Sequence, residues 1–129
     1  MTNEARKPSC ACGVAPKLIF ACSGAADVGH IADLAARKLT KEGVGKMYCL
    51  AGIGERVSGI METTRAASKI LAIDGCPLNC AKLTLEQAGF SNFQHLQLAD
   101  LGLAKGQTPA SDEAITRVAS AGAGKLAVA

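Results

Sequence analysis

Short apolar runs separated by longer amphipathic stretches dominate the sequence. The runs cover residues 17–22, 46–51, 69–75 and 92–98. A continuous apolar run of this length is typical of a strand that is buried on both faces, as in a parallel sheet. The last run alternates between apolar and polar residues, which predicts a half-exposed strand at the edge of the sheet.

Between these runs, apolar residues recur at the spacing of a helix. The pattern predicts helices at residues 28–39, 57–64, 77–88 and 111–119. Pro77 is favourable as a first helical residue, and Ser111 followed by two acidic residues is a typical helix start. The alanine- and glycine-rich stretch from Ser120 is expected to fray.

Alternating strands and helices at this spacing predict a parallel sheet with right-handed helical crossovers. We therefore expect a three-layer α/β/α fold, Rossmann-like or flavodoxin-like, with a four-stranded, mainly parallel sheet in the order 2-1-3-4. Residues 17–119 would form this single domain. Residues 1–16 would be a polar N-terminal arm and residues 120–129 a flexible C-terminal tail.

The composition narrows the class of protein. The 129 residues are 49% hydrophobic and 19% charged, which excludes a disordered chain. A net charge of +3 and 3% aromatic residues argue against a nucleic-acid partner. No apolar run approaches the roughly 20 residues of a membrane span, so no membrane association is expected. The polar N-terminus lacks a secretory signal, and we expect a cytoplasmic protein whose six cysteines are free.

Four of the cysteines are expected at one edge of the sheet. Cys22 ends the first predicted strand, Cys49 lies near the end of the second, and Cys76 follows the third. The carboxyl ends of parallel strands share an edge, and this edge holds the binding sites of such folds. Cys80 follows Cys76 by four residues and would lie on the same face of the next helix. Four thiols from three loops would therefore converge.

Convergent thiols are compatible with several functions. Four thiolates can hold one zinc ion, and they serve an iron–sulfur cluster equally well. Alternatively, a thiol redox or sulfur-handling enzyme would use Cys76 as nucleophile and Cys80 as resolving thiol, with Asp74 as a proton acceptor. Asp74-Gly75 is also an ordinary turn pair, and each cysteine can be a small buried apolar residue. The expected partners are a metal ion and an unknown small molecule or protein.

Other candidate residues carry weaker signals. Cys10 and Cys12 form a pair in the polar arm, to which we assign a separate role. His30 and His95 are expected to face solvent. The glycines of residues 51–55 do not match a phosphate-binding motif and would let the backbone pass close to the cysteines.

The segment Ile73-Asp74-Gly75-Cys76-Pro77-Leu78-Asn79-Cys80 resembles the DGC-domain family, which is named after its Asp-Gly-Cys motif. The similarity extends to residues 20–24 and 48–54, and covers roughly residues 17–119. Members of this family are described as zinc-binding proteins. The resemblance implies that Cys22, Cys49, Cys76 and Cys80 are zinc ligands, and it implies no reaction.

Overall fold

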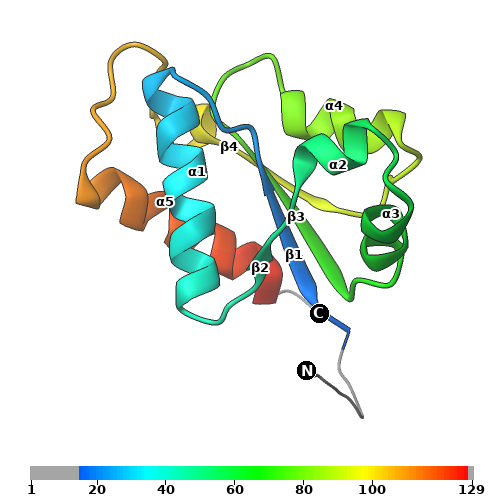
Figure 1. Ribbon diagram of the computed structural model, residues 1–129. Helices are drawn as coiled ribbons and strands as arrows, with labels where there is room; N and C mark the ends of the chain where they lie inside the picture. Colours follow the sequence, from blue (N-terminus) through cyan, green and yellow to red (C-terminus); the bar gives the residue numbers. More distant parts are fainter. Residues whose placement is uncertain (1–14, 128–129) are drawn as a thin grey trace.

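The computed structural model describes residues 15–127 of the chain. It contains a four-stranded, all-parallel sheet in the order β2-β1-β3-β4, which confirms the predicted fold and strand order (Figure 1). The strands are β1 (Lys17–Ala21), β2 (Lys46–Met47), β3 (Lys69–Asp74) and β4 (Gln94–Gln97).

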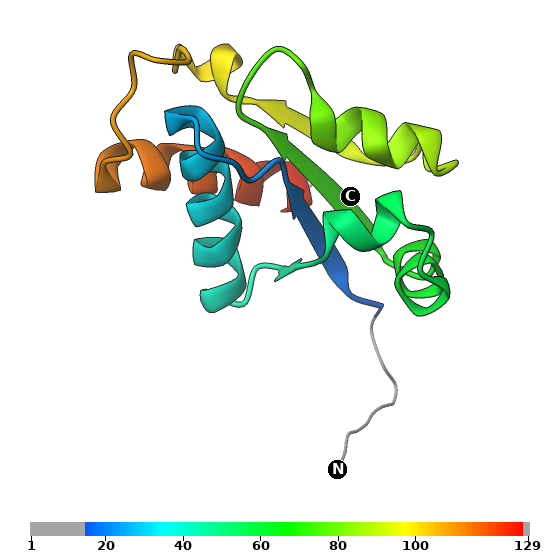
Figure 2. The ribbon, with the colours of Figure 1, turned by 45° about the horizontal axis from the view of Figure 1, so that its top comes forward.

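Helices cover both faces of the sheet. One layer consists of α1 (Asp27–Lys41) and α5 (Asp112–Ala127). The other consists of α2 (Leu50–Gly54), α3 (Ser58–Arg65) and α4 (Cys80–Gln87) (Figure 2). A short 3-10 helix, η1 (Leu98–Leu101), follows β4. No helix within residues 15–127 is both long enough and apolar enough to cross a membrane.

Apart from the residues at their ends, the two central strands are apolar because consecutive residues face opposite helical layers. Ile19 and Leu71 pack toward α1 and α5, whereas Leu18 and Phe20 pack toward α2, α3 and α4. All four side chains are completely buried. The short apolar runs of the sequence thus have the origin that was predicted, namely burial on both faces.

The second strand is much shorter than predicted. It ends at Met47, although Tyr48 still donates its backbone N–H to the carbonyl of Ile19 at 2.8 Å. Cys49 then caps α2, because its sulfur accepts the N–H of Gly52 at 3.3 Å. The prediction of a strand through residue 51 is therefore wrong, and α2 was not predicted.

Helix α4 begins at Cys80 rather than at Pro77, so the predicted helix start is wrong. Asn79 adopts a left-handed conformation with φ of 55° and ψ of 45°, which interrupts the helical backbone. Its N–H donates to the carbonyl of Cys76 at 3.2 Å and closes a turn. Consequently Cys80, and not Cys76, occupies the first position of the helix.

The C-terminal helix α5 is longer than predicted. The Ser111 hydroxyl accepts the N–H of Ala114 at 3.2 Å, which confirms the expected cap. The helix continues to Ala127 and buries Leu126, so the tail expected from residue 120 is helical through residue 127. Lys17, at the start of β1, donates its Nζ to the carbonyl of Leu126 at 3.1 Å. The start of the sheet and the end of the last helix are thereby joined.

Arg56 connects the ends of α2 and α4. Its guanidinium donates to the carbonyls of Ile53 at 2.9 Å and Gly54 at 3.1 Å, and to the carbonyl of Gln87 at 2.9 Å. These carbonyls lie at helix C-termini, where backbone acceptors lack helical partners. The two helices that begin beside Cys49 and Cys80 are therefore fixed relative to each other.

Asp27 connects the start of α1 to the loop before α5. Its carboxylate accepts backbone N–H groups of Gly106 at 2.9 Å, Thr108 at 3.0 Å and Val28 at 2.8 Å. The hydrogen bonds from Gly106 and Thr108 are the main reason that the pKa of Asp27 is lowered. A carboxyl group with a lowered pKa stabilises the fold above its unfolded-state pKa, and this contribution disappears as the pH falls through the folded-state value.

We therefore expect Asp27→Asn to lower the free energy of unfolding at pH 7. The difference from the wild type should shrink as the pH drops below about 4, the ordinary aspartate range. Urea denaturation at pH 7 and at about pH 3 measures both quantities. Glu86→Gln, at an exposed position of α4, is the control and should show no such pH-dependent difference. A difference for Asp27→Asn that does not change with pH would contradict the assignment.

Candidate functional site

Four free thiols lie at the carboxyl edge of the sheet. Cys22 follows β1, Cys49 follows β2, Cys76 follows β3, and Cys80 begins α4. Cys22 and Cys76 are partly buried, whereas Cys49 and Cys80 are exposed. Cys10 and Cys12 lie outside the described residues.

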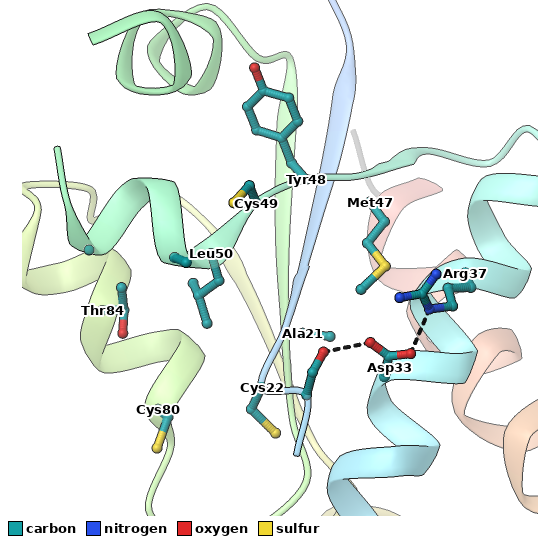
Figure 3. Close-up of a pocket in the computed structure, with 13 residues that line it drawn as sticks. Ala21, Cys22, Asp33, Arg37, Met47, Tyr48, Cys49, Leu50, Cys80 and Thr84 are labelled. Atoms are coloured by element: carbon teal, nitrogen blue, oxygen red, sulfur yellow. Dashed lines mark hydrogen bonds and ion pairs between the residues drawn. The ribbon is translucent and has the colours of Figure 1, made fainter. Parts of the chain in front are cut away.

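The four thiols surround two adjoining cavities. The smaller cavity, of about 160 Å³, is lined by Cys22, Cys76 and Cys80 together with the start of α1. The larger cavity, of about 680 Å³, is lined by Cys22, Cys49 and Cys80 together with part of α1 (Figure 3). Cys22 and Cys80 belong to both walls. Cys49 contributes only to the larger cavity and Cys76 only to the smaller one.

The chemistry of this donor set fits zinc, but its arrangement is not a closed metal site. Four cysteine sulfurs are a common zinc-binding set. Within residues 15–127, no three histidine, cysteine, aspartate or glutamate side chains are grouped closely enough to bind one ion. The expected convergence is thus incomplete: the structure brings three thiols to one cavity and leaves Cys49 in the wall of its neighbour.

Cys22 lies between the other thiols and retains its proton. Burial is the main cause that raises its pKa, and the N–H of Gly75, which donates to its sulfur at 3.0 Å, only partly offsets this effect. Electrostatic repulsion from Asp74, and from Cys76 and Cys80 when they are ionised, raises the pKa further. At neutral pH this side chain is therefore a neutral thiol until a cation or a reaction removes the proton.

Asp74 is a buried carboxylate that fixes the start of α4. It is 0% exposed, and its two oxygens accept the N–H groups of Ala81 at 2.8 Å and Lys82 at 3.0 Å. The ring nitrogen Nε2 of His95 lies 2.9 Å from the second oxygen. Negative charge is favourable at a helix N-terminus, where unpaired N–H groups point outward. Asp74 therefore does more than form a turn.

The expectation that His95 faces solvent is wrong. His95 is paired with Ala72 in the β3–β4 register, and Ala72 packs toward α4. The ring consequently lies on the α4 side of the sheet and contacts Asp74, with 23% of the side chain exposed. His30 is exposed on α1, as predicted.

Gly75 lies where the backbone of α1 crosses closely. A Cβ atom at this position would be 2.5 Å from the carbonyl oxygen of Val28 and 2.9 Å from the nitrogen of Gly29. Only glycine allows this approach without moving α1. The three residues of the Asp-Gly-Cys motif thus have separate roles. Asp74 accepts hydrogen bonds from the start of α4, Gly75 leaves room for the backbone of α1, and Cys76 lines the smaller cavity.

The glycines of residues 51–55 bring backbone close to the cysteines, as expected: the N–H of Gly52 donates to the Cys49 sulfur at 3.3 Å, and Gly54 lines the larger cavity. They are two of the five residues of α2, and a Cβ atom at Gly52 would clash with the side chain of Ile60 in α3. Gly54 faces open space. Gly52 therefore also allows a close approach between α2 and α3.

The sequence analysis did not predict a series of hydrogen bonds that links the loop before α1 to two side chains of α1. Ser23 donates its hydroxyl to Asp33 Oδ1, and Arg37 donates Nε to Asp33 Oδ2, both at 2.6 Å (Figure 3). Partial burial by itself would raise the pKa of Asp33. The two hydrogen bonds and the electrostatic effect of Arg37 and His30 are together larger, so the pKa is lowered. The four-residue spacing of Asp33 and Arg37 is a sequence signal for this pair. The proximity of both side chains to Cys22 comes only from the fold.

Two comparisons with known proteins found similar sequences. The model of the DGC domain family matches residues 18–121. The chain is similar to the anaerobic and virulence modulator AnvM of Pseudomonas aeruginosa, with 38% identity over 88 residues, which is 68% of this chain and 67% of AnvM. No solved structure is significantly similar to the chain.

The close approach at Gly75 leads to a prediction about stability. Gly75→Ala should reduce the free energy of unfolding by about 1–3 kcal/mol, because the added methyl group forces α1 away from β3. Gly124→Ala is the matched control, since a Cβ there meets nothing within 4 Å and alanine favours the interior of α5. Urea denaturation of both variants measures the two free energies of unfolding. Equal stability of the Gly75 and Gly124 variants would contradict the close packing.

Proposed function

The chain belongs to the DGC domain family, and on this basis we propose that it is a zinc-binding protein that holds one ion through Cys22, Cys49, Cys76 and Cys80. The observation that carries the proposal is the sharing of Cys22 and Cys80 between two cavities that together contain all four thiols. An ion near these two shared residues needs only one additional ligand from each cavity.

Cys49 is the residue whose surroundings must change most on binding. Its sulfur accepts the N–H of Gly52, and it lies at the start of a helix of five residues. So short a helix gains little stability from its own hydrogen bonds, so its first turn can rearrange while Arg56 keeps its C-terminal end beside α4. The other three cysteines already line the same cavity. Binding of zinc would therefore join α2 to the ends of β1 and β3.

A site with four thiolates is closed to water. Such a site stabilises the loops that supply its ligands, or stores and transfers the metal, and it does not activate a water molecule. The raised pKa of Cys22 means that binding must displace a proton from this thiol. The affinity for zinc should therefore increase with pH.

The proposal predicts the metal content of single variants. Protein purified under reducing conditions without added metal should contain close to one equivalent of zinc by elemental analysis. Changing any one of Cys22, Cys49, Cys76 and Cys80 to serine should lower the zinc affinity by at least about 100-fold, since one of four ligands is lost.

The double variant Cys10→Ser/Cys12→Ser is the matched control and should keep the full metal content. Less than about a tenth of an equivalent of transition metal in the wild type would overturn the proposal, on the one-ion stoichiometry of such sites. Visible absorbance of protein purified without oxygen would instead identify an iron–sulfur cluster.

A second candidate function is thiol redox or sulfur chemistry at Cys76 and Cys80. It is favoured by the turn in which the N–H of Asn79 donates to the carbonyl of Cys76, because this turn places both cysteines in the wall of the smaller cavity. The Cys76 thiolate would attack a substrate disulfide, form a mixed disulfide and release one thiol. Attack by the Cys80 thiolate on the Cys76 sulfur would then form a Cys76–Cys80 disulfide and release the second thiol.

This candidate predicts a specific cross-link. Mild oxidation with a small disulfide should produce a Cys76–Cys80 disulfide that peptide mass mapping detects. Cys80→Ser should accumulate the mixed disulfide on Cys76, whereas Cys76→Ser should not accumulate one on Cys80. Oxidation that leaves both thiols free, or that modifies them independently, would exclude a redox pair.

A further inference from the structure

The larger cavity combines a thiol with an anchored cation. Arg37 reaches the cavity from α1, and its Nε is held by Asp33, whose other oxygen accepts the hydroxyl of Ser23. Both carboxylate oxygens of Asp33 are therefore already paired. Asp33 itself lines the cavity, and its hydrogen bonds with Ser23 and Arg37 partly balance its charge there.

The terminal nitrogens of Arg37 remain available for a ligand. Within the part of the chain that the structure describes, no hydrogen bond to them is found, and the side chain is 66% exposed. Figure 3 shows these nitrogens on the side of the guanidinium that faces Met47, away from Asp33. A guanidinium with free terminal N–H groups binds a carboxylate through paired hydrogen bonds.

The larger cavity also has apolar side chains in its wall. Met47 lines the cavity on the side of Arg37, Leu50 lines it beyond Cys49, and Cys49 is exposed (Figure 3). The volume of about 680 Å³ is in the range of small-molecule sites. The wall thus presents a cation, a short apolar surface and a reactive sulfur. These features are complementary to a compound with a carboxylate, a short carbon chain and a sulfur atom.

We propose that the larger cavity binds a small disulfide that carries a carboxylate, and that Cys49 exchanges with it. The carboxylate binds Arg37, and the Cys49 thiolate attacks the nearer sulfur of the disulfide. A bond forms between Cys49 and this sulfur, the bond between the two substrate sulfurs breaks, and the leaving thiolate takes a proton from water. The disulfide is the oxidant, and no further reactant is needed.

The inference deepens the proposed function of the same edge, and only its consequence for the metal rests on that function. A Cys49 sulfur in a mixed disulfide cannot be a metal ligand, so exchange would remove one of the four zinc ligands. The exchange itself depends only on Cys49 and on the charge of Arg37. The two proposals can therefore fail separately.

The test compares two disulfides of similar size that differ in charge, dithiodipropionate and bis(2-hydroxyethyl) disulfide. The full-length reduced protein is treated with each probe, and peptide mass mapping follows the rate of modification at Cys49. In Arg37→Gln, the preference for the carboxylate probe should fall roughly three- to tenfold, as expected for a partly exposed charge-assisted hydrogen bond. Arg37→Lys should recover part of the preference, and added salt should reduce it in the wild type.

Arg65→Gln is the matched control, because Arg65 pairs with Glu62 on α3 and does not line this cavity. It should keep the wild-type preference. An unchanged preference in Arg37→Gln, or modification at Cys80 in place of Cys49, would overturn the inference. Metal analysis of the same samples separates the two proposals. Bound zinc with no preference for the carboxylate probe would overturn only the disulfide exchange. A preference that depends on Arg37 in protein without zinc would overturn only the metal proposal.

Discussion

The hydrogen bonds of the Asp74 carboxylate are the interaction on which the cysteines at the carboxyl edge of the sheet depend. A buried charge is costly unless hydrogen bonds compensate it, and Asp74 obtains this compensation from two N–H groups of α4 and from His95. The start of α4 therefore cannot move without leaving the carboxylate unpaired. Since Cys80 begins this helix and Cys76 follows Asp74 by two residues, the same interaction positions both thiols.

The backbone crossing at Gly75 adds a second constraint from the opposite layer. Asp74 holds α4 on one face of β3 by hydrogen bonds, and the absence of a side chain at Gly75 lets α1 pack closely on the other face. The smaller cavity lies between these two helices and is lined by residues of both starts. Its shape thus follows from contacts of the short Asp-Gly-Cys segment with elements that are distant in sequence.

Much of the fold could be predicted because β1 and β3 are buried on both faces and their interiors therefore consist of uninterrupted apolar residues. The run at residues 46–51 is equally apolar, yet most of it is not strand. The secondary structure of this run depends on the cap formed by Cys49 and on the packing of α2 against α3, neither of which is visible in a local pattern of apolar residues. The start of α4 was missed for a related reason, since the left-handed Asn79 has its side chain held by Gln97 of β4.

The site was predictable to the extent that strand order determines it. The order 2-1-3-4 places the four cysteines at one edge. Their division between two cavities depends on the side-chain directions of Cys49 and Cys76, and the approach of Arg37 depends on how α1 crosses the sheet.

The hydrogen bond between Lys17 and the carbonyl of Leu126 has a consequence for how the domain can be attached to other molecules. Both ends of the described segment lie at the amino edge of the sheet, about 16 Å of strand away from the thiols at a rise of about 3.3 Å per residue. A polypeptide fused at either end, or a surface to which either end is tethered, leaves the carboxyl edge pointing outward. Tethering would therefore orient the cysteines toward whatever approaches from solution.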